Sequence, residues 1–303
     1  MTGLATDAAE VAGPSAVRRL GQGSVGFVRL VMRNKVGFVG FLIFAIIVLV
    51  SFIGPFFTPD NPPNTTRIYQ PPSRAHWFGT DYSGRDVLIQ IIDGGRSVLI
   101  VGFMAATLTT VIAVVFGALS AYVGGVVDSV ITGLADAILT IPRLPLLAVL
   151  AGFITFKSVW QLAIIIALLD WPTLLRAVRA QVLSLRERDY VEAAQTLALG
   201  TPHILFREIL PNMRSYIAIS FTIGMTGAIY DQIGLYFLGL APLAGDNWGI
   251  MLNFAFARGA IFFKNSFWYI MAPVIMISLV QLAMVTMTRS LEDIFNPRLR
   301  EGA

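Results

Sequence analysis

The sequence predicts an all-α membrane protein with six transmembrane helices, and two observations lead to this prediction. The first is composition: charged residues make up 13% of the 303 residues and hydrophobic residues 56%, with a mean hydropathy of +0.73. An average soluble domain has about 25% charged residues. So little charge cannot cover a compact globule with polar surface, so apolar area must face lipid or partner subunits.

The second observation is the length of the apolar segments. A helix needs about 20 apolar residues to cross the hydrocarbon core of a bilayer. Six segments meet this requirement, at approximately residues 36–59, 97–127, 130–154, 159–178, 215–238 and 266–288. Pro142 and Pro145 interrupt the third segment and Pro172 the fourth, so we expect hinges or kinks there.

Basic residues set the expected orientation in the cell membrane. A basic cluster precedes the first span, and the positive-inside rule therefore places the N-terminus in the cytoplasm. Six crossings return the C-terminus, with Arg289, Arg298 and Arg300, to the same side. The chain is thus expected to be a multi-pass protein of the inner or plasma membrane, after an Ala-, Gly- and Ser-rich N-terminal tail (residues 1–17) that is expected to be disordered.

Several functions are excluded by what the sequence lacks. It has no cysteine, which rules out disulfides and cysteine catalysis, and none of its three lysines follows a GxxxxG phosphate-binding loop. We find no HExxH or GxSxG motif and assign no catalytic residue, no metal ligand and no cofactor to this chain. The basic residues are scattered between apolar blocks, so we expect no nucleic acid partner despite the net charge of +4.

The polar segment between the fourth and fifth spans is expected to form a helix-turn-helix on the cytoplasmic surface. We expect Gly200 to end its first helix, Thr201 to cap the second, Pro202 to be the first residue of the second helix, and Pro211 to end it. The first helix has an apolar face that includes Val191. The segment could lie on lipid headgroups, or it could dock in the groove of a partner.

Four ionisable residues fall at membrane depth: Asp136, Arg143, Asp170 and Asp231. Burying a charge in a bilayer costs from about 3 to more than 10 kcal/mol, so such residues normally face a cavity or a partner. Asp136, Arg143 and Asp231 could line a polar translocation pathway, or Asp136 could pair with Arg143. Asp170 could accept hydrogen bonds from backbone groups freed by a kink at Pro172.

Four motifs resemble those of one family. The pattern Glu192-Ala193-Ala194, Gly200, Ile209-Leu210-Pro211 is similar to the EAA motif of ABC-importer permeases. Residues 78–96, 236–252 and 296–300 resemble motifs of the C-type permease subunit of dipeptide, oligopeptide and nickel importers. The first of these motifs, expected on the extracytoplasmic side, contains Gly79, Thr80, Asp81, Gly84, Arg85 and Asp86. Gln232 takes the place of a family glutamate, so it joins the pathway candidates.

The resemblance implies a type I ABC importer permease fold. It divides the chain into the tail, an N-terminal region (residues 18–96) and a permease core (residues 97–303) with a coupling loop at residues 185–211. This loop would dock onto an ATP-binding subunit through Glu192, Ala193, Ala194, Gly200, Thr201, Pro202, Ile209, Leu210 and Pro211.

The same resemblance implies partners and a cargo. The partners would be a second, B-type permease subunit, two ATP-binding subunits that carry ATP and Mg, and an extracytoplasmic substrate-binding protein. The expected cargo is a di- or oligopeptide, with oligosaccharides or nickel as alternatives within the family. A different class, an ion-coupled secondary transporter in which the membrane aspartates carry protons, also remains open.

Overall fold

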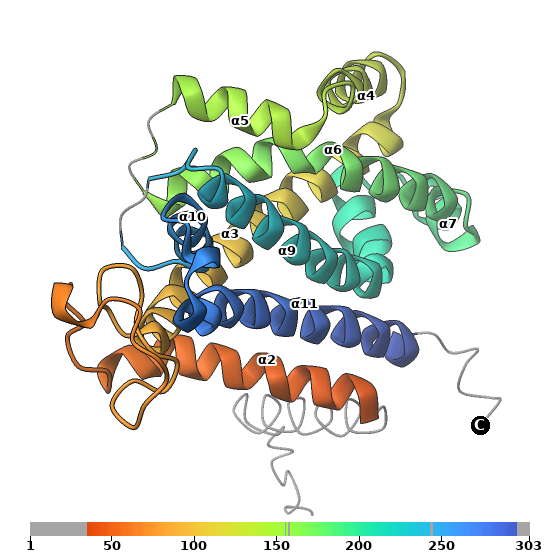
Figure 1. The fold of residues 1–303 in the computed structure, drawn as a ribbon. Coiled ribbons are helices and arrows are strands. Elements are labelled where there is room, and N and C mark those ends of the chain that lie inside the picture. The colour runs from red at the N-terminus through yellow and green to blue at the C-terminus, as the bar shows by residue number, and fades with distance from the viewer. Residues whose placement is uncertain (1–34, 155, 157, 243–244, 296–303) are drawn as a thin grey trace, which may run out of the picture.

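A computed structural model describes residues 35–154, 156, 158–242 and 245–295 and shows a bundle of helices (Figure 1). The expected all-α class is confirmed: across the described residues the only extended pairing is an isolated bridge between Thr80 and Asp86. The tail, most of the N-terminal basic cluster and the motif at residues 296–300 lie outside these residues. Five long helices run side by side: α2 (Lys35–Ile53), α3 (Val87–Val123), α6 (Val159–Arg186), α9 (Arg214–Phe237) and α11 (Phe267–Phe295).

The bundle has two different ends. Residues 54–86, 238–242 and 245–266 gather at one, which we call the loop end, and residues 187–213 lie at the other, which we call the helix-turn-helix end (Figure 1). The loop end contains short helical turns and the 10-residue helix α10 (Trp248–Ala257). The short turns are η1 (Gly54–Phe56), η2 (Thr65–Arg67), η5 (Ala260–Phe262) and η6 (Lys264–Ser266).

Helix α3 is the central element of the bundle. Its 37 residues extend ~55 Å at the α-helical rise, and it contacts α2, α6, α9 and α11. Small buried residues such as Ala105, Ala106 and Ala113 allow the neighbouring helices to approach it closely. The boundary expected between residues 96 and 97 falls inside this continuous helix.

The expected spans correspond to helices, although not all of them are equally apolar. Helices α2, α3, α6 and α11 are long and apolar enough to cross a membrane, with α2 continuing into η1. Helix α9 has 24 residues, or ~36 Å, which is long enough, but it is more polar and packs against α3 and α11. The multi-pass membrane class is therefore confirmed.

The third expected span is two helices rather than one. Helix α4 (Gly125–Leu139) and helix α5 (Arg143–Phe153) meet at an angle of 86°. Proline disfavours helical geometry in the residue before it, and Pro142 itself is extended with ψ 128, so the chain leaves α4 and restarts at Arg143. Pro145 lies in the first turn of α5, where proline is tolerated. Alone, α5 covers ~16 Å, about half of a hydrocarbon core.

Pro172 behaves differently, because α6 continues through it from Val159 to Arg186.

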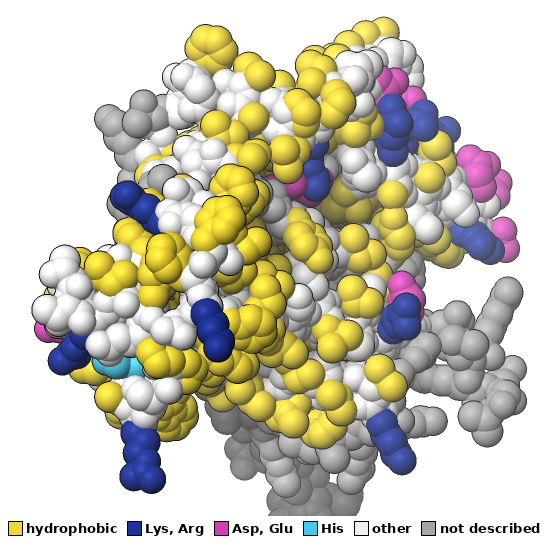
Figure 2. Space-filling view, viewed as in Figure 1, with side chains coloured by type: hydrophobic (Ala, Val, Ile, Leu, Met, Phe, Trp, Pro, Cys, Tyr) yellow, Lys and Arg dark blue, Asp and Glu magenta, His cyan; other side chains and the backbone are white. Residues whose placement is uncertain are grey.

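Much of the molecular surface is apolar, as expected for a protein that faces lipid (Figure 2). Helix α2 exposes one such face, formed by Val36, Val39, Leu42, Ile46 and Leu49. Its opposite face packs closely on α11, where Gly40 lies against Thr286.

This close approach predicts the effect of adding a methyl group. A Cβ at Gly40 would lie 1.9 Å from Thr286 Oγ1 and 3.0 Å from the Ala283 carbonyl oxygen. We expect Gly40→Ala to destabilise the protein by about 1–3 kcal/mol, as overpacking does, and to lower its melting temperature in detergent. Gly133→Ala is the matched control, because nothing lies within 4 Å of that Cβ and alanine favours helix by about 1 kcal/mol. Equal melting temperatures for the two variants would contradict the packing described.

Candidate functional site

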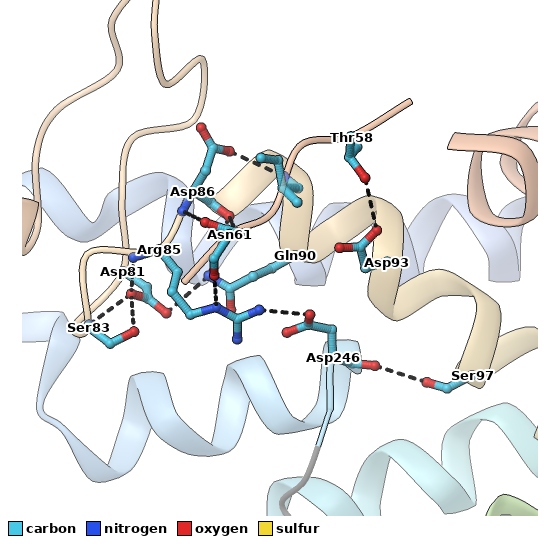
Figure 3. A network of polar contacts seen from close by, with 11 residues as sticks. Thr58, Asn61, Asp81, Ser83, Arg85, Asp86, Gln90, Asp93, Ser97 and Asp246 are labelled. Atoms are coloured by element: carbon cyan, nitrogen blue, oxygen red, sulfur yellow. Dashed lines mark hydrogen bonds and ion pairs between the residues drawn. The ribbon is translucent and has the colours of Figure 1, made fainter. Parts of the chain in front are cut away.

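Three polar regions of the bundle could carry function: the loop end, the helix-turn-helix, and a cavity between α5, α6 and α9. At the loop end, the motif at residues 79–86 folds back onto the start of α3 (Figure 3). Asp86 caps that helix, since its carboxylate accepts hydrogen bonds from the Leu88 and Ile89 amides at 2.8 and 3.2 Å. The other Asp86 oxygen lies 2.7 Å from Nδ1 of His76.

Asp81 organises the turn before this cap. Its carboxylate accepts hydrogen bonds from the Ser83 amide and hydroxyl, the Arg85 amide and the Gln90 side chain, at 2.8 to 3.0 Å. The residue is 1% exposed. Burial, and then the negative charge of Asp81, raise the pKa of the neighbouring Tyr82 phenol. Asp81 therefore has a structural role, since its buried carboxylate holds the turn at residues 81–85 against α3.

The remaining motif residues join distant parts of the chain. Arg85 donates to Asp246 at 2.8 Å and to the Asn61 carbonyl oxygen at 2.9 Å (Figure 3). Thr80 donates to the Arg67 carbonyl oxygen and accepts from the Gln70 amide. Gly79 and Gly84 have φ of 71° and 78°, and a Cβ at Gly84 would lie 1.8 Å from the Asn64 carbonyl oxygen. The motif thus fastens the loop at residues 57–86 to α3 and to residue 246.

The helix-turn-helix at the other end differs in detail from expectation. Helix α7 (Asp189–Thr196) ends in a Schellman motif, in which the Ala198 amide donates to the Gln195 carbonyl and the Leu199 amide to the Ala194 carbonyl. The left-handed residue is Ala198, with φ 53°. The expectation that Gly200 would occupy that position is wrong, because Gly200 is extended with φ −63° and ψ 153° and precedes the next helix.

The second helix of the helix-turn-helix was expected to end at Pro211, but the chain stays helical beyond it. It begins with α8 (Thr201–His203) and passes through η3 (Ile204–Ile209) and η4 (Leu210–Met213) directly into α9. Thr201 is the first helical residue rather than the cap, and Pro202 follows it. Pro211 does not end the helix: it lies at the start of a 3₁₀ turn, where a missing amide hydrogen leaves no bond broken.

The apolar face of this segment is buried inside the protein. Val191, Ile204 and Ile209 are 0–1% exposed and form one cluster with residues of α3 and α6, including Ala118, Ala121, Val178 and Val182. That face therefore does not lie on lipid headgroups. Among the motif residues, Ala194 and Ile209 are buried, Thr201 and Leu210 are half-buried, and Glu192, Ala193, Gly200, Pro202 and Pro211 are exposed.

A cavity of about 370 Å³ lies between α5, α6 and α9 and reaches α3. Arg143, the first residue of α5, borders it and forms two ion pairs across helices: Nη1 with Asp170 of α6, and Nη2 with Asp231 of α9 at 3.1 Å. Asp170 also borders the cavity. The other lining residues are Thr109, Thr173, Leu174, Ala177, Tyr216, Ser220, Ile223, Gly224 and Gly227.

The structure places the four pathway candidates in three different environments. Arg143 and Asp231 come together, but Asp136 lies on the surface in an ion pair with Arg176 of α6, so its expected alternative pairing with Arg143 is wrong. Gln232 is fully buried and donates to the Val98 carbonyl oxygen of α3 at 2.6 Å, away from the cavity lining.

Asp170 accepts a hydrogen bond from Arg143 instead of the expected bonds from backbone groups freed at Pro172.

Sequence reasoning missed the partner residues Arg176 and Asp246, whose ion pairs join positions 40 and 161 residues apart. No local spacing could have signalled such pairs. No group of three or more potential metal ligands occurs in the part of the chain that the structure describes.

Comparisons with known proteins agree with this arrangement. Residues 113–301 match the model of the family described as "Binding-protein-dependent transport system inner membrane component", and residues 26–72 match "N-terminal TM domain of oligopeptide transport permease C". The chain belongs to this family of transport-system membrane components. It is therefore a permease subunit, a multi-pass membrane protein of the ABC-importer class.

Relatives extend over most of the permease. A protein of Brucella suis whose name describes a peptide permease is 34% identical over 270 residues, covering 88% of each chain. The oligopeptide transport system permease protein OppC of Bacillus subtilis is 32% identical, covering 88% of this chain and 87% of its own. The dipeptide transport system permease protein DppC of the same organism is 31% identical, covering 90% of this chain and 85% of its own.

The hydrogen bonds of Asp81 predict that the permease depends on it for stability. In Asp81→Ala, the buried Gln90 amide and the turn amides lose their acceptor, and each unsatisfied buried group costs about 1–3 kcal/mol. We expect a lower melting temperature and faster trypsin cleavage after Arg67 and Arg74. Asp60→Ala is the control, because Asp60 is exposed in the same loop and should change stability by no more than about 0.5 kcal/mol. Equal protease resistance of the two variants would show that the anchor is not needed.

Proposed function

We propose that this permease forms half of the translocation pathway of an ATP-driven importer of di- and oligopeptides. The single observation that carries the proposal is the helix-turn-helix, which is rooted in α3 and α6 by its apolar face and presents Glu192 outward. Relatives named for peptide, oligopeptide and dipeptide transport favour peptides over the oligosaccharides or nickel also considered.

The proposed orientation has the helix-turn-helix end in the cytoplasm. Arg176, Arg179, Arg186, Arg207 and Arg214 all lie on or beside the helices of this end, as the positive-inside rule favours. Helix α2 begins and α11 ends there too (Figure 1), so both termini would be cytoplasmic. The loop end would then meet a substrate-binding protein on the extracytoplasmic side.

The proposed complex has four further components besides cargo: a B-type permease subunit, two ATP-binding subunits and the binding protein. ATP and Mg would be held by the ATP-binding subunits. Closure of the ATPase pair would push on α7 and on residues 201–209. Because Val191 and Ile209 pack against α3 and α6, this push would reach the helices that border the cavity.

Replacing Glu192 tests the docking role without disturbing the fold. Its side chain is exposed and forms no ion pair within the described residues, so Glu192→Lys should leave membrane insertion and melting temperature unchanged. We expect it to reduce ATP-dependent peptide uptake into proteoliposomes of the assembled complex at least tenfold, because a reversed charge at a docking surface repels its partner.

Glu292→Lys is the matched control, since it makes the same charge change at the same end of the molecule, on α11. It should retain uptake. Full uptake by the Glu192 variant would refute the docking assignment. Uptake that persists in the complete absence of the ATP-binding subunits would instead favour the ion-coupled carrier and overturn the proposed function.

A further inference from the structure

The ion pairs of Arg143 leave one carboxylate in excess. The guanidinium of Arg143 on α5 pairs with two carboxylates, that of Asp170 on α6 and that of Asp231 on α9. Among the described residues, Arg143 and Asp170 are the charged ones that line the cavity. The basic residues that follow Asp170 on α6, Arg176 and Arg179, are paired with Asp136 and Asp128. With both carboxylates ionised, the cluster has a formal charge of −1 at membrane depth.

Such an excess charge favours an incoming cation. An ionised group in a bilayer costs several kcal/mol unless it is paired, and a cation that reaches the cavity would remove that cost. An incoming anion would add a third negative charge and be repelled. The cluster therefore has the electrostatic character of a site for an ammonium group.

The geometry allows an incoming ammonium group to replace Arg143 as the ion-pair partner of Asp170. Asp170 borders the cavity, whereas Asp231 is 5% exposed and lies behind Arg143. The second Asp231 oxygen, Oδ2, is buried and has no hydrogen-bond partner within the described residues. If an ammonium group took over Asp170, Arg143 could turn fully to Asp231 and satisfy both carboxylate oxygens in the bidentate manner that arginine favours.

The cavity suits a small peptide chain. Its volume of about 370 Å³ lies within the range of small-molecule pockets, ~300–1,000 Å³. Thr173, Ala177, Ser220, Gly224 and Gly227 supply small or hydroxyl-bearing walls, which leave room for varied side chains. The cavity extends from the ion pairs along α9 toward Tyr216, in the direction of the helix-turn-helix end.

We propose that Asp170, with Arg143 and Asp231 behind it, is a subsite in the translocation pathway for the α-ammonium group of the transported peptide. This inference rests on the proposed function, because it assigns a chemical group of the proposed cargo to a place in the cavity. Binding exchanges one ion-pair partner for another and breaks no covalent bond. The peptide's own carboxylate would point away from the cluster.

The test compares two cargoes in two permeases. Tri-alanine and N-acetyl-tri-alanine differ in the ammonium group, and the initial rates of their ATP-dependent uptake are measured in proteoliposomes of the complete complex with its binding protein. The ratio of the two rates is compared between the wild type and Asp170→Asn. The selectivity of the binding protein is the same in both permeases, so it cancels. We expect the preference for tri-alanine to fall about tenfold, the loss expected for a hydrogen bond to a charged group.

Two further variants keep the result interpretable. Asp136→Asn makes the same chemical change in an ion pair outside the cavity lining and should keep the wild-type ratio. Asp170→Glu keeps the negative charge and should restore much of the preference, which a merely structural role in assembly would not require.

The outcomes separate the two proposals. An unchanged ratio in Asp170→Asn, with tri-alanine still transported, overturns the ammonium subsite and leaves the peptide importer standing; this is also the result expected if a proton neutralises the second carboxylate. No uptake of tri-alanine by the wild-type complex overturns the proposed peptide cargo itself. A fall in the ratio that Asp136→Asn reproduces would also overturn the subsite.

Discussion

Ion pairs between helices position the broken segment α4–α5 in the bundle. Arg143 joins α5 to α6 and α9, while Asp128 and Asp136 join α4 to Arg179 and Arg176 of α6. Helix α4 packs on α3 and α6, but α5 has few packing contacts, and both helices expose much surface. The position of the broken segment therefore depends strongly on these ion pairs, which fix both of its halves against α6.

Helix α6 contacts both the cavity and the helix-turn-helix. The part of α6 that bears Asp170 borders the cavity, and the part that bears Val178 and Val182 packs against the helix-turn-helix. Pro172 lies between them without breaking the helix. Because one continuous helix contacts both regions, packing through α6 connects α7 to the cavity.

The sequence was sufficient for features that depend on local pattern. Apolar length located the long helices, Pro142 marked the break, and the EAA pattern located the segment between α6 and α9. The end of the first helix was predicted at the wrong residue. Gly200 was expected to end it, but the amides of Ala198 and Leu199 close α7 earlier and Ala198 takes the left-handed position. Ion pairs such as Arg143 with Asp231 join distant segments, and a single sequence carries no signal for them.

Arg143 links the ion pairs at the cavity to the direction of α5 after the turn between α4 and α5. It is the first residue after the 86° turn, so its side chain and the direction of α5 are set together. Its two partners lie on α6 and α9, and both of these helices also contact α3. Any event that withdraws Asp170 from Arg143, whether cargo binding or movement of α6, removes one of the two restraints on the start of α5. In the proposed pathway, a reorientation of this short helix of 11 residues would move one wall of the cavity without deforming the long helices.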